Sequence, residues 1–316
     1  MISVVIPTLN RSKLLEKTLE SLTQQTTNSP EFEVLVIDNG STDSTQQIVA
    51  NFSQWLDIRC ILEVRPGLHE GRHRGMRESR GDILAFADDD IQALPTWIQG
   101  IAESFGDPKV GLVGGKNLPD YESTPPEWLD HHWTTVREGK FMTYFSVLDF
   151  GDQTRFIDPL YVFGCNFSVR KNIVADAKGF HPDGMPQSLI KFRGDGESHV
   201  ARHVARMGYT SLYNPKASVR HWVPSSRMNM EYLIKRAFAE GISQSYTDTR
   251  DRYLHKKEKK LTLLSRLKNS LRVRLLSENE RRIRASFEEG YKYHQNELAK
   301  DKGLLAWVLR ETYMDV

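Results

Sequence analysis

Three consecutive carboxylates, Asp88, Asp89 and Asp90, form the densest group of chemically active side chains in this sequence. They follow Ile83 to Ala87, a run suited to a buried strand, with no turn between. Ligands of open α/β sheets bind just beyond the carboxyl ends of the strands. Adjacent carboxylates repel one another unless a cation neutralises them, and Mg²⁺ often shares carboxylate oxygens with substrate phosphates. The stretch predicts a metal–diphosphate site or, alternatively, an acidic loop or helix N-terminus.

Asp38 occupies a similar position, because it ends a second apolar run, Phe32 to Ile37. A turn at residues 39–40 follows, and Ser41 to Asp43 provides polar side chains that can cap a helix. Right-handed crossover connections would bring Asp38 and the acidic triplet to one edge of a parallel sheet. We therefore expect a nucleotide to lie along that edge. The alternative gives Asp38 only a turn role and Asp43 only a capping role.

Apolar runs alternate with segments of helical spacing, which predicts an α/β fold with a parallel sheet and helices on both faces. The expected strands are residues 2–6, ended by Pro7, then 32–37, 58–64, 83–87 and 110–115. The expected helices are residues 14–22, capped by Asn10 or Ser12, then 41–52, 69–80, 95–105 and 198–207. A later apolar run, Leu160 to Val169, contains Gly164, and a glycine there marks a bulge or a close backbone approach to a ligand.

Composition narrows the class of protein. The chain has 316 residues, of which 39% are hydrophobic and 27% charged, so it can form one large domain with an appendage, or two domains. No apolar run approaches the roughly 20 residues of a membrane-spanning helix, and Met1 leads directly into the first strand. Cys60 and Cys165 provide neither a disulfide framework nor a zinc cluster. We therefore expect a cytoplasmic protein.

Several motifs occur in a characteristic order. They are Val4 to Arg11, Val36 to Asp43, Gly71 to Gly75, Asp88 to Asp90, Gly164 to Phe167 and Gly179-Phe180. This ordered set resembles the family 2 glycosyltransferases with the GT-A fold, over roughly residues 2–222. The third motif departs from the family pattern, because Gly71 and His73 replace alanine and asparagine. The resemblance implies a GT-A type, Rossmann-like mixed sheet that is mainly parallel, with helices on both faces.

The resemblance also implies roles for individual residues. The set implied to bind the nucleotide is Pro7, Thr8, Asn10, Asp38, Arg72, Asp88 and Asp89. A carboxylate at position 38 suits the N–H of a uracil ring as acceptor, which favours UDP. Asp90 and Asp88 would hold Mn²⁺ or Mg²⁺, and His221 would complete the coordination. The alternative makes His221, beside Trp222, a structural residue.

The implied general base departs from the family pattern. The family usually has Glu-Asp before the helix that ends in Gly-Tyr, and the aspartate is the base. Counting back from Gly208, that position falls on Glu197, with Gly196 in the glutamate position and Asp195 two residues upstream of Glu197. The resemblance therefore implies Glu197 as the base, with Asp195 as a competitor. Carboxylates at a helix N-terminus are also often only caps.

The implied reaction is the inverting transfer of a sugar from a nucleoside diphosphate to a hydroxyl of a glycan or lipid-linked acceptor. A metal would neutralise the leaving diphosphate, and a carboxylate would take the proton of the acceptor. One alternative is a nucleotidyltransferase that makes sugar nucleotides, although Pro7 to Arg11 lacks the expected phosphate-loop glycine. Another alternative is a non-catalytic partner subunit that binds nucleotide sugars.

The C-terminal part of the chain is basic. Residues 252–285 contain 12 Lys/Arg and 3 Asp/Glu, a net charge of +9. We expect residues 1–227 to form the catalytic domain and residues 228–316 a mainly helical extension. Within Leu261 to Leu276, leucines recur at spacings of three and four among basic residues, which predicts a surface helix. It would bind an anionic membrane, making the protein peripheral on the inner face, or pack on protein, including a homo-oligomer. No nucleic-acid-binding module accompanies the charge.

Overall fold

The structure, a computed structural model, describes residues 1–184, 186–255 and 276–314. The chain divides into two compact units. The first unit contains Met1–His181, Gly196–Ser225 and Thr312–Val316, and the second contains Pro182–Asp195 and Ser226–Glu311. One crossing between the units therefore falls between Asp195 and Gly196, directly before Glu197.

An eight-stranded sheet forms the centre of the described part of the first unit, in the order β11-β13-β6-β12-β4-β1-β2-β3. Its strands are β1 (Ile2–Thr8), β2 (Phe32–Asp38), β3 (Asp57–Leu62), β4 (Ile83–Ala87), β6 (Val110–Gly114), β11 (Arg155–Phe156), β12 (Asn166–Arg170) and β13 (Thr210–Tyr213). Strands β1 to β4 run parallel, whereas β12 runs antiparallel to β4 and β6. The predicted mixed, mainly parallel α/β sheet is confirmed, and Asp38 and Asp88 share its carboxyl edge.

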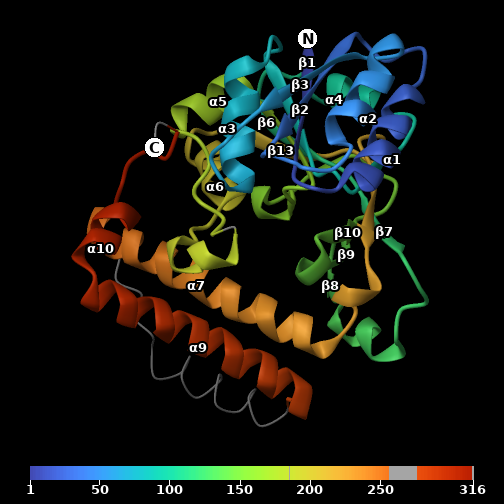
Figure 1. The fold of residues 1–316 in the computed structure, drawn as a ribbon. Coiled ribbons are helices and arrows are strands. Elements are labelled where there is room, and N and C mark those ends of the chain that lie inside the picture. The colour runs from blue at the N-terminus through green and yellow to red at the C-terminus, as the bar shows by residue number, and fades with distance from the viewer. Residues whose placement is uncertain (185, 256–275, 315–316) are drawn as a thin grey trace. The chain divides into compact units, whose positions relative to one another are not determined.

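Helices cover both faces of this sheet, as the sequence predicted (Figure 1). They are α1 (Ser12–Thr23), α2 (Thr45–Asn51), α3 (Leu68–Glu78), α4 (Trp97–Ser104), α5 (Lys171–Asp176) and α6 (Glu197–Arg206). A separate hydrophobic cluster lies on each face of the sheet. Val4 belongs to the cluster under α1, α2 and α4, and its neighbour Val5 belongs to the cluster under α3, α5 and α6. This alternation follows from the two-residue period of a strand, which sends adjacent side chains to opposite faces.

A six-stranded sheet of the first unit, counted among the described residues, has the order β5-β14-β7-β10-β9-β8. Its strands are β5 (Ile91–Ala93), β7 (Asn117–Tyr121), β8 (Thr134–Val136), β9 (Gly139–Met142), β10 (Val147–Asp149) and β14 (Val219–Val223). Asn166 of β12 donates to Asn117 of β7 at 3.1 Å and accepts from the Trp97 indole at 2.9 Å. These buried amides join the two sheets.

The expectation that Pro7 ends the first strand is wrong, because β1 continues through Pro7 to Thr8. The Thr8 carbonyl accepts from the Asn39 N–H on the β2 side at 2.9 Å, so the backbone of the preceding Pro7 faces the other side. On that side the pairing with β4 ends at Val5 and Phe86. The ladder therefore needs no N–H from residue 7, and proline is tolerated there.

The predicted cap of the first helix is also wrong. Helix α1 has Arg11 at its N-cap position, and neither Asn10 nor Ser12 caps it. Instead, Asp43 accepts from the Ser12 N–H at 2.9 Å and from the Thr45 N–H at 3.1 Å. One carboxylate from the loop after β2 therefore satisfies donors in the first turns of both α1 and α2.

The predicted helical C-terminal extension is confirmed for the described residues. Helices α7 (Met230–His255), α9 (Glu278–Lys300) and α10 (Lys302–Val308) belong to the second unit. A Cβ atom at Gly241 would lie 2.0 Å from the Phe287 carbonyl oxygen, and one at Gly290 would lie 2.0 Å from the Phe238 carbonyl oxygen. The two glycines therefore allow α7 and α9 to pack in backbone contact.

The predicted surface helix within Leu261 to Leu276 lies almost entirely outside the described residues, as does most of the basic stretch 252–285. No helix among residues 1–184, 186–255 and 276–314 is long and apolar enough to cross a membrane. The described residues also form short 3₁₀ helices, namely η1 (Phe52–Gln54), η2 (Glu127–His132), η3 (Thr143–Phe145), η4 (Pro159–Tyr161), η5 (Gln187–Phe192) and η6 (Ser225–Arg227).

Candidate active site at the carboxyl edge of the sheet

The acidic triplet follows β4 directly, and most of it is buried. Asp89 and Asp90 are 3% and 5% exposed, whereas the Asp88 side chain is 27% exposed. Thr8, at the end of the neighbouring strand β1, donates its hydroxyl to Asp89 at 2.7 Å. Buried carboxylates this close together need positively charged partners to remain ionised. Arginines from two separate elements supply them.

Arg11, which was not among the predicted site residues, pairs with two members of the triplet. Its guanidinium lies 2.7 Å from Asp89 Oδ1 and 2.5 Å from Asp90 Oδ2. Burial raises the pKa of Asp89 to about 7, and Arg11 opposes part of that rise. Burial would also raise the pKa of Asp90, but His221 and Arg11 hold it below its usual value. The signals in the sequence were its place at the end of the motif Val4 to Arg11 and its basic side chain three residues after Thr8.

His221 reaches the triplet through a long-range strand pairing. Strand β5 begins directly after Asp90 and pairs antiparallel with β14, so that Ile91 lies opposite His221. As a result, His221 Nε2 lies 3.3 Å from Asp90 Oδ1. The other ring nitrogen, Nδ1, lies 2.7 Å from the Phe145 carbonyl oxygen. Because a carbonyl can only accept, Nδ1 carries a hydrogen.

This arrangement fits a divalent cation. When His221 is neutral its hydrogen lies on Nδ1, and the Nε2 lone pair then faces a carboxylate oxygen, so the two acceptors attract only through a proton or a cation between them. Asp88, Asp90 and His221 each offer one ligand atom, and these atoms lie within 4.8 Å of one another. Carboxylate oxygens and an imidazole nitrogen form a donor set that suits ions such as Mn²⁺. The structure thus brings together the three predicted metal ligands.

Asp38 is 1% exposed at the end of β2. Its Oδ1 accepts from the Ser41 N–H at 2.7 Å, whereas Oδ2 is buried without a hydrogen-bond partner among the described residues. A buried acceptor without a donor is costly, so a ligand that donates a hydrogen bond to Oδ2 would remove this cost. Asn10 has a left-handed φ of 54° and accepts from the Thr42 N–H at 2.8 Å. Asn10 therefore joins the loop after β1 to the loop after β2.

Helix α3 approaches β1 closely because two glycines face that strand. A Cβ atom at Gly75 would lie 2.2 Å from Val5 Cγ1, and one at Gly71 would lie 2.9 Å from Pro7 Cβ. Any larger side chain at these positions would force the helix away from the sheet. Pro7 is therefore part of the packing that fixes the distance between α3 and β1.

Arg72 is only 1% exposed and lies between several site groups. Its Nη2 donates to Asp88 Oδ1 at 3.0 Å and to the Gly164 carbonyl at 2.8 Å. Its Nε and Nη1 have no hydrogen-bond partner among the described residues. Nη1 lies 3.8 Å from Glu197 Oε2. One buried guanidinium therefore lies between the acidic triplet and the predicted base.

Glu197 is the first residue of α6, with its side chain 34% exposed. Its Oε2 also lies 3.6 Å from Nε2 of His69, a second residue that was not predicted for the site. Asp195 belongs to the second unit, where it accepts from the Thr247 hydroxyl at 3.2 Å. Of the two candidate bases, Glu197 is the one that belongs to the same unit as the triplet.

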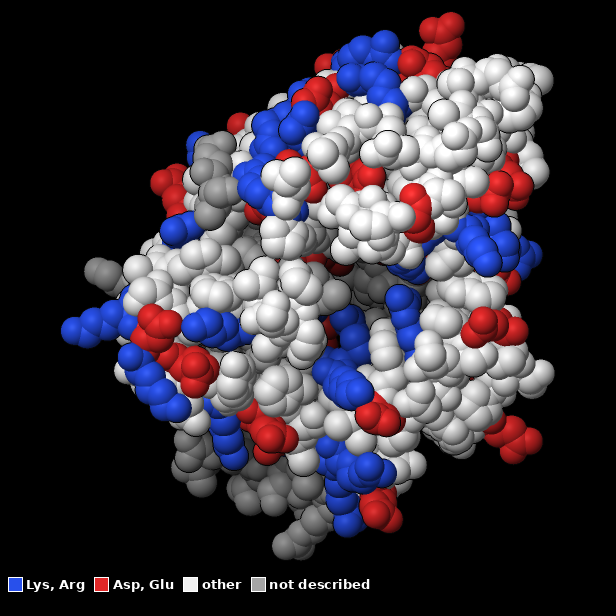
Figure 2. All heavy atoms as spheres, viewed as in Figure 1, with Lys and Arg blue, Asp and Glu red and all other residues white. Residues whose placement is uncertain are grey.

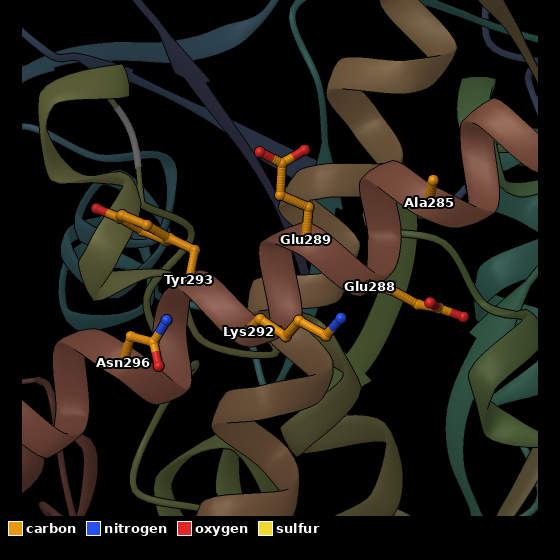
Figure 3. Close-up of a pocket in the computed structure, with 6 residues that line it drawn as sticks. All are labelled: Ala285, Glu288, Glu289, Lys292, Tyr293 and Asn296. Carbon is orange, nitrogen blue, oxygen red and sulfur yellow. The ribbon is translucent and has the colours of Figure 1, made fainter.

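A hollow elsewhere on the surface has a different character (Figure 3). The described residues that line it all come from α9, and they are Ala285, Glu288, Glu289, Lys292, Tyr293 and Asn296. The helix turns the opposite stripe, which contains Gly290 and His294, inward. Among the described residues, the outer face of one helix therefore lines the hollow, and none of the predicted site residues does.

The amino-acid sequence is similar to those of known glycosyltransferases. The sequence model described as glycosyl transferase family 2 matches residues 3–176, which is 174 of the 316 residues. A glucosyl-dolichyl phosphate glucuronosyltransferase from Haloferax volcanii is 24% identical over 262 residues, covering 78% of this chain and 77% of the relative. Validoxylamine A glucosyltransferase from Streptomyces hygroscopicus is 37% identical over 115 residues, covering 36% of this chain and 27% of the relative.

Structural comparison supports the same fold. A mannosyltransferase from Pyrobaculum calidifontis, solved in complex with GDP-Man and Mn²⁺, superposes with a TM-score of 0.56 at 19% identity. The superposition covers 99% of this chain and 84% of that one. The predicted GT-A type fold is thereby confirmed. Taken with the family match over more than half of its length, this shows that the chain belongs to glycosyl transferase family 2 and is a glycosyltransferase that acts on sugar donors.

Proposed function

We propose that the protein transfers a sugar from a UDP-sugar to a hydroxyl with inversion, using a divalent metal and Glu197 as general base. The observation that carries the proposal is the meeting of Asp88, Asp90 and His221 within 4.8 Å on the same sheet edge as Asp38. Glu197 is linked to this group through Arg72, which lies 3.0 Å from Asp88 and 3.8 Å from Glu197.

Asp88, Asp90 and His221 would hold the metal, which supplies positive charge for the leaving diphosphate. The Phe145 carbonyl fixes the His221 ring, so that Nε2 is the nitrogen available as a ligand. Arg11 pairs with Asp89, which is not one of the proposed metal ligands, and Arg72 would share the charge of Asp88 with the metal. This division of charge supports a site that binds both a cation and an anionic donor.

Asp38 supports uracil as the base of the donor. Its one orphaned oxygen, Oδ2, matches the single N3–H donor of uracil. Guanine presents two adjacent donors, which a carboxylate meets best with both oxygens, and Asp38 Oδ1 already accepts from Ser41. The relative solved with GDP-Man makes GDP the necessary competitor in any test.

Glu197 supports the proposed inversion. Its partly exposed carboxylate can take the proton from an acceptor hydroxyl while that oxygen attacks the anomeric carbon from the face opposite the diphosphate. The new C–O bond forms as the C–O bond to the diphosphate breaks, and the proton stays on Glu197. A single displacement of this kind needs no covalent intermediate, so the anomeric configuration inverts.

Calorimetry with UDP, GDP and dTDP, each with and without Mn²⁺ or Mg²⁺, tests the nucleotide and the metal together. We expect UDP to bind most tightly with metal, and Asp90→Asn to weaken that binding about 10-fold or more, as loss of a metal ligand should. Tight UDP binding that ignores both the metal and this variant would contradict the metal site. Tighter binding of GDP would contradict the role of Asp38 in selecting uracil.

Assays of turnover separate the remaining alternatives. We expect UDP to be released from at least one of UDP-Glc, UDP-GlcNAc and UDP-glucuronic acid. Release of pyrophosphate from UTP and a sugar 1-phosphate would instead identify a nucleotidyltransferase. A UDP-sugar that binds but is never consumed would identify a non-catalytic binding subunit.

A lipid-linked sugar is our proposal for the acceptor. The relative from Haloferax volcanii is named for a glucosyl-dolichyl phosphate, and residues 252–285 carry the +9 charge that an anionic membrane attracts. Among the described residues on the face shown in Figure 2, basic and acidic side chains are interspersed. We propose that the attraction comes from the +9 charge of residues 252–285. Vesicles of phosphatidylglycerol should bind the protein at low salt, and replacing Lys256, Lys257, Lys259 and Lys260 by glutamine should abolish binding. Unchanged binding would contradict the proposal.

A further inference from the structure

We infer that His69 is a positioning residue for Glu197, an inference that rests on the proposed function. His69 Nε2 lies 3.6 Å from Glu197 Oε2. An ionised carboxylate can only accept, so this approach is favourable when Nε2 carries a hydrogen. The N–H can then donate to Oε2, one of the two carboxylate oxygens of the proposed base. The distance is slightly longer than a hydrogen bond, and a small shift of the partly exposed Glu197 side chain would close it.

The His69 ring is held rigidly from several sides. It is 4% exposed and stacks on the Phe180 ring, with centroids 5.1 Å apart and planes 11° apart. Gly196, with φ of +53°, passes so close that a Cβ atom there would lie 2.9 Å from His69 Nε2. The backbone directly before Glu197 is therefore shaped around this ring nitrogen. A fixed donor beside a flexible carboxylate is the arrangement that restricts the carboxylate.

Arg72 and Gly164 complete the confinement of Glu197. Arg72 Nη1 lies 3.8 Å from the same oxygen, Oε2, that faces His69. A Cβ atom at Gly164 would lie 2.7 Å from Glu197 Oε1 and 2.9 Å from Arg72 Nη2. The absence of a side chain at position 164 thus makes room for the carboxylate and the guanidinium together. Both oxygens of Glu197 have neighbours among the described residues, and His69 offers this carboxylate a ring N–H in place of a guanidinium.

Two substitutions separate the donor from the packing. His69→Phe keeps a ring for stacking on Phe180 but removes the N–H, whereas His69→Gln places an amide N–H near the former Nε2 but removes the ring. If His69 positions the base, His69→Phe should lower kcat for UDP release about 10-fold to 100-fold, the scale of a hydrogen bond to a charged group. His69→Gln should retain most of kcat. The affinity for UDP, measured by calorimetry, should stay within about 2-fold in both variants.

The same measurements in a Glu197→Gln background show whether His69 acts through Glu197. There, His69→Phe should lower kcat by less than about 2-fold, because the two residues form one functional unit. His203→Asn is a matched control, since it removes a partly buried histidine from the same helix as Glu197, six residues away, and should leave kcat unchanged.

The outcomes are decisive in either direction. Full kcat in His69→Phe, or an equal loss in His69→Phe and His69→Gln, would overturn the inference, since the second result marks a packing role. If Glu197→Gln lowers kcat as expected while His69→Phe leaves kcat unchanged, only the inference fails. If Glu197→Gln turns over normally, the proposed base and the inference fail together. Should His69→Phe lose UDP binding through misfolding, kcat of His69→Gln decides, and a value below one tenth of normal overturns the inference.

Discussion

The acidic edge of the eight-stranded sheet and the α7–α9 helix pair both bury polar side chains, but of different kinds. The helix pair buries neutral groups, most of which bond to one another, although His294 Nε2 has no hydrogen-bond partner among the described residues. Ser245 is hydrogen-bonded to His294 Nδ1 at 2.7 Å and accepts from Gln295 at 2.9 Å, while Ser286 donates to the Ile234 carbonyl at 2.9 Å. Such pairs fix which residues of two helices face each other, because a shift would leave each group without its partner.

The sheet edge instead buries ions. Asp38, Asp89, Asp90 and Arg72 are all at most 5% exposed, and Asp38 Oδ2 and Arg72 Nε lack a hydrogen-bond partner among the described residues. Removing ions from water has a desolvation cost that can exceed the attraction between the buried charges. The difference indicates where ligands can bind. Polar groups that bond to one another stabilise one arrangement of the chain, whereas charged groups without a full set of hydrogen-bond partners remain available to a ligand. Exchanging residues in each region tests this distinction.

The largest expected effect is on turnover. Glu197→Gln should lower kcat by about 10² to 10⁴, because the amide cannot take the acceptor proton. Its thermal midpoint should change little, since Glu197 is partly exposed. Asp195→Asn is the matched control and should keep most of its activity. The reverse pattern would move the base to Asp195, and loss of folding in Glu197→Gln would make Glu197 a structural residue like those of the helix pair.

The second effect is on stability alone. Gly290→Ala places a Cβ atom 2.0 Å from the Phe238 carbonyl oxygen, so it should lower the free energy of unfolding by about 3 kcal/mol. The affinity of the folded protein for UDP should not change. Gly303→Ala, in α10, is the control, because its Cβ meets only a side-chain oxygen at 3.1 Å. Urea unfolding with equal m-values would measure the difference, and a stable Gly290→Ala would contradict the close helix contact.

The third effect depends on pH. Burial lowers the pKa of His294 to about 4 from an ordinary value of 6.5. Between these values the unfolded chain binds a proton that the folded chain does not, so stability falls as the pH drops from 6.5 to 4. The loss should reach at most about 3 kcal/mol, and urea unfolding at several pH values measures it. His294→Gln should flatten the dependence of stability on pH. An unchanged dependence would contradict the lowered pKa of His294 in the folded protein.

The smallest effect concerns the nucleobase. Asp38→Asn keeps an oxygen for the Ser41 N–H but replaces Oδ2 by a donor, so UDP affinity should fall about 10-fold, or roughly 1.4 kcal/mol. CDP, whose ring nitrogen accepts, should gain relative to UDP. Calorimetry of both nucleotides with the wild type and the variant checks the exchange. Equal losses for the two nucleotides would mean that Asp38 shapes the loop without reading the base.

The sequence alone determined the frame of the protein. Alternating apolar runs and helical spacings predicted the parallel strands. Parallel strands bring their carboxyl ends to one edge, so the pattern was sufficient to place Asp38 near Asp88 to Asp90. The helical nature of the C-terminal part was also predictable. These features depend on residues close together in the chain, whose spacing is visible as a pattern.

Only the tertiary structure decided how the site is completed. His221 meets Asp90 because β5 pairs with β14, far along the chain, and Arg11 meets Asp89 and Asp90 across a loop. Likewise, Asp43 replaces the expected local cap, and a unit boundary separates Asp195 from Glu197. Each of these outcomes depends on contacts between distant segments, and a local pattern carries no information about which distant segment a side chain will meet.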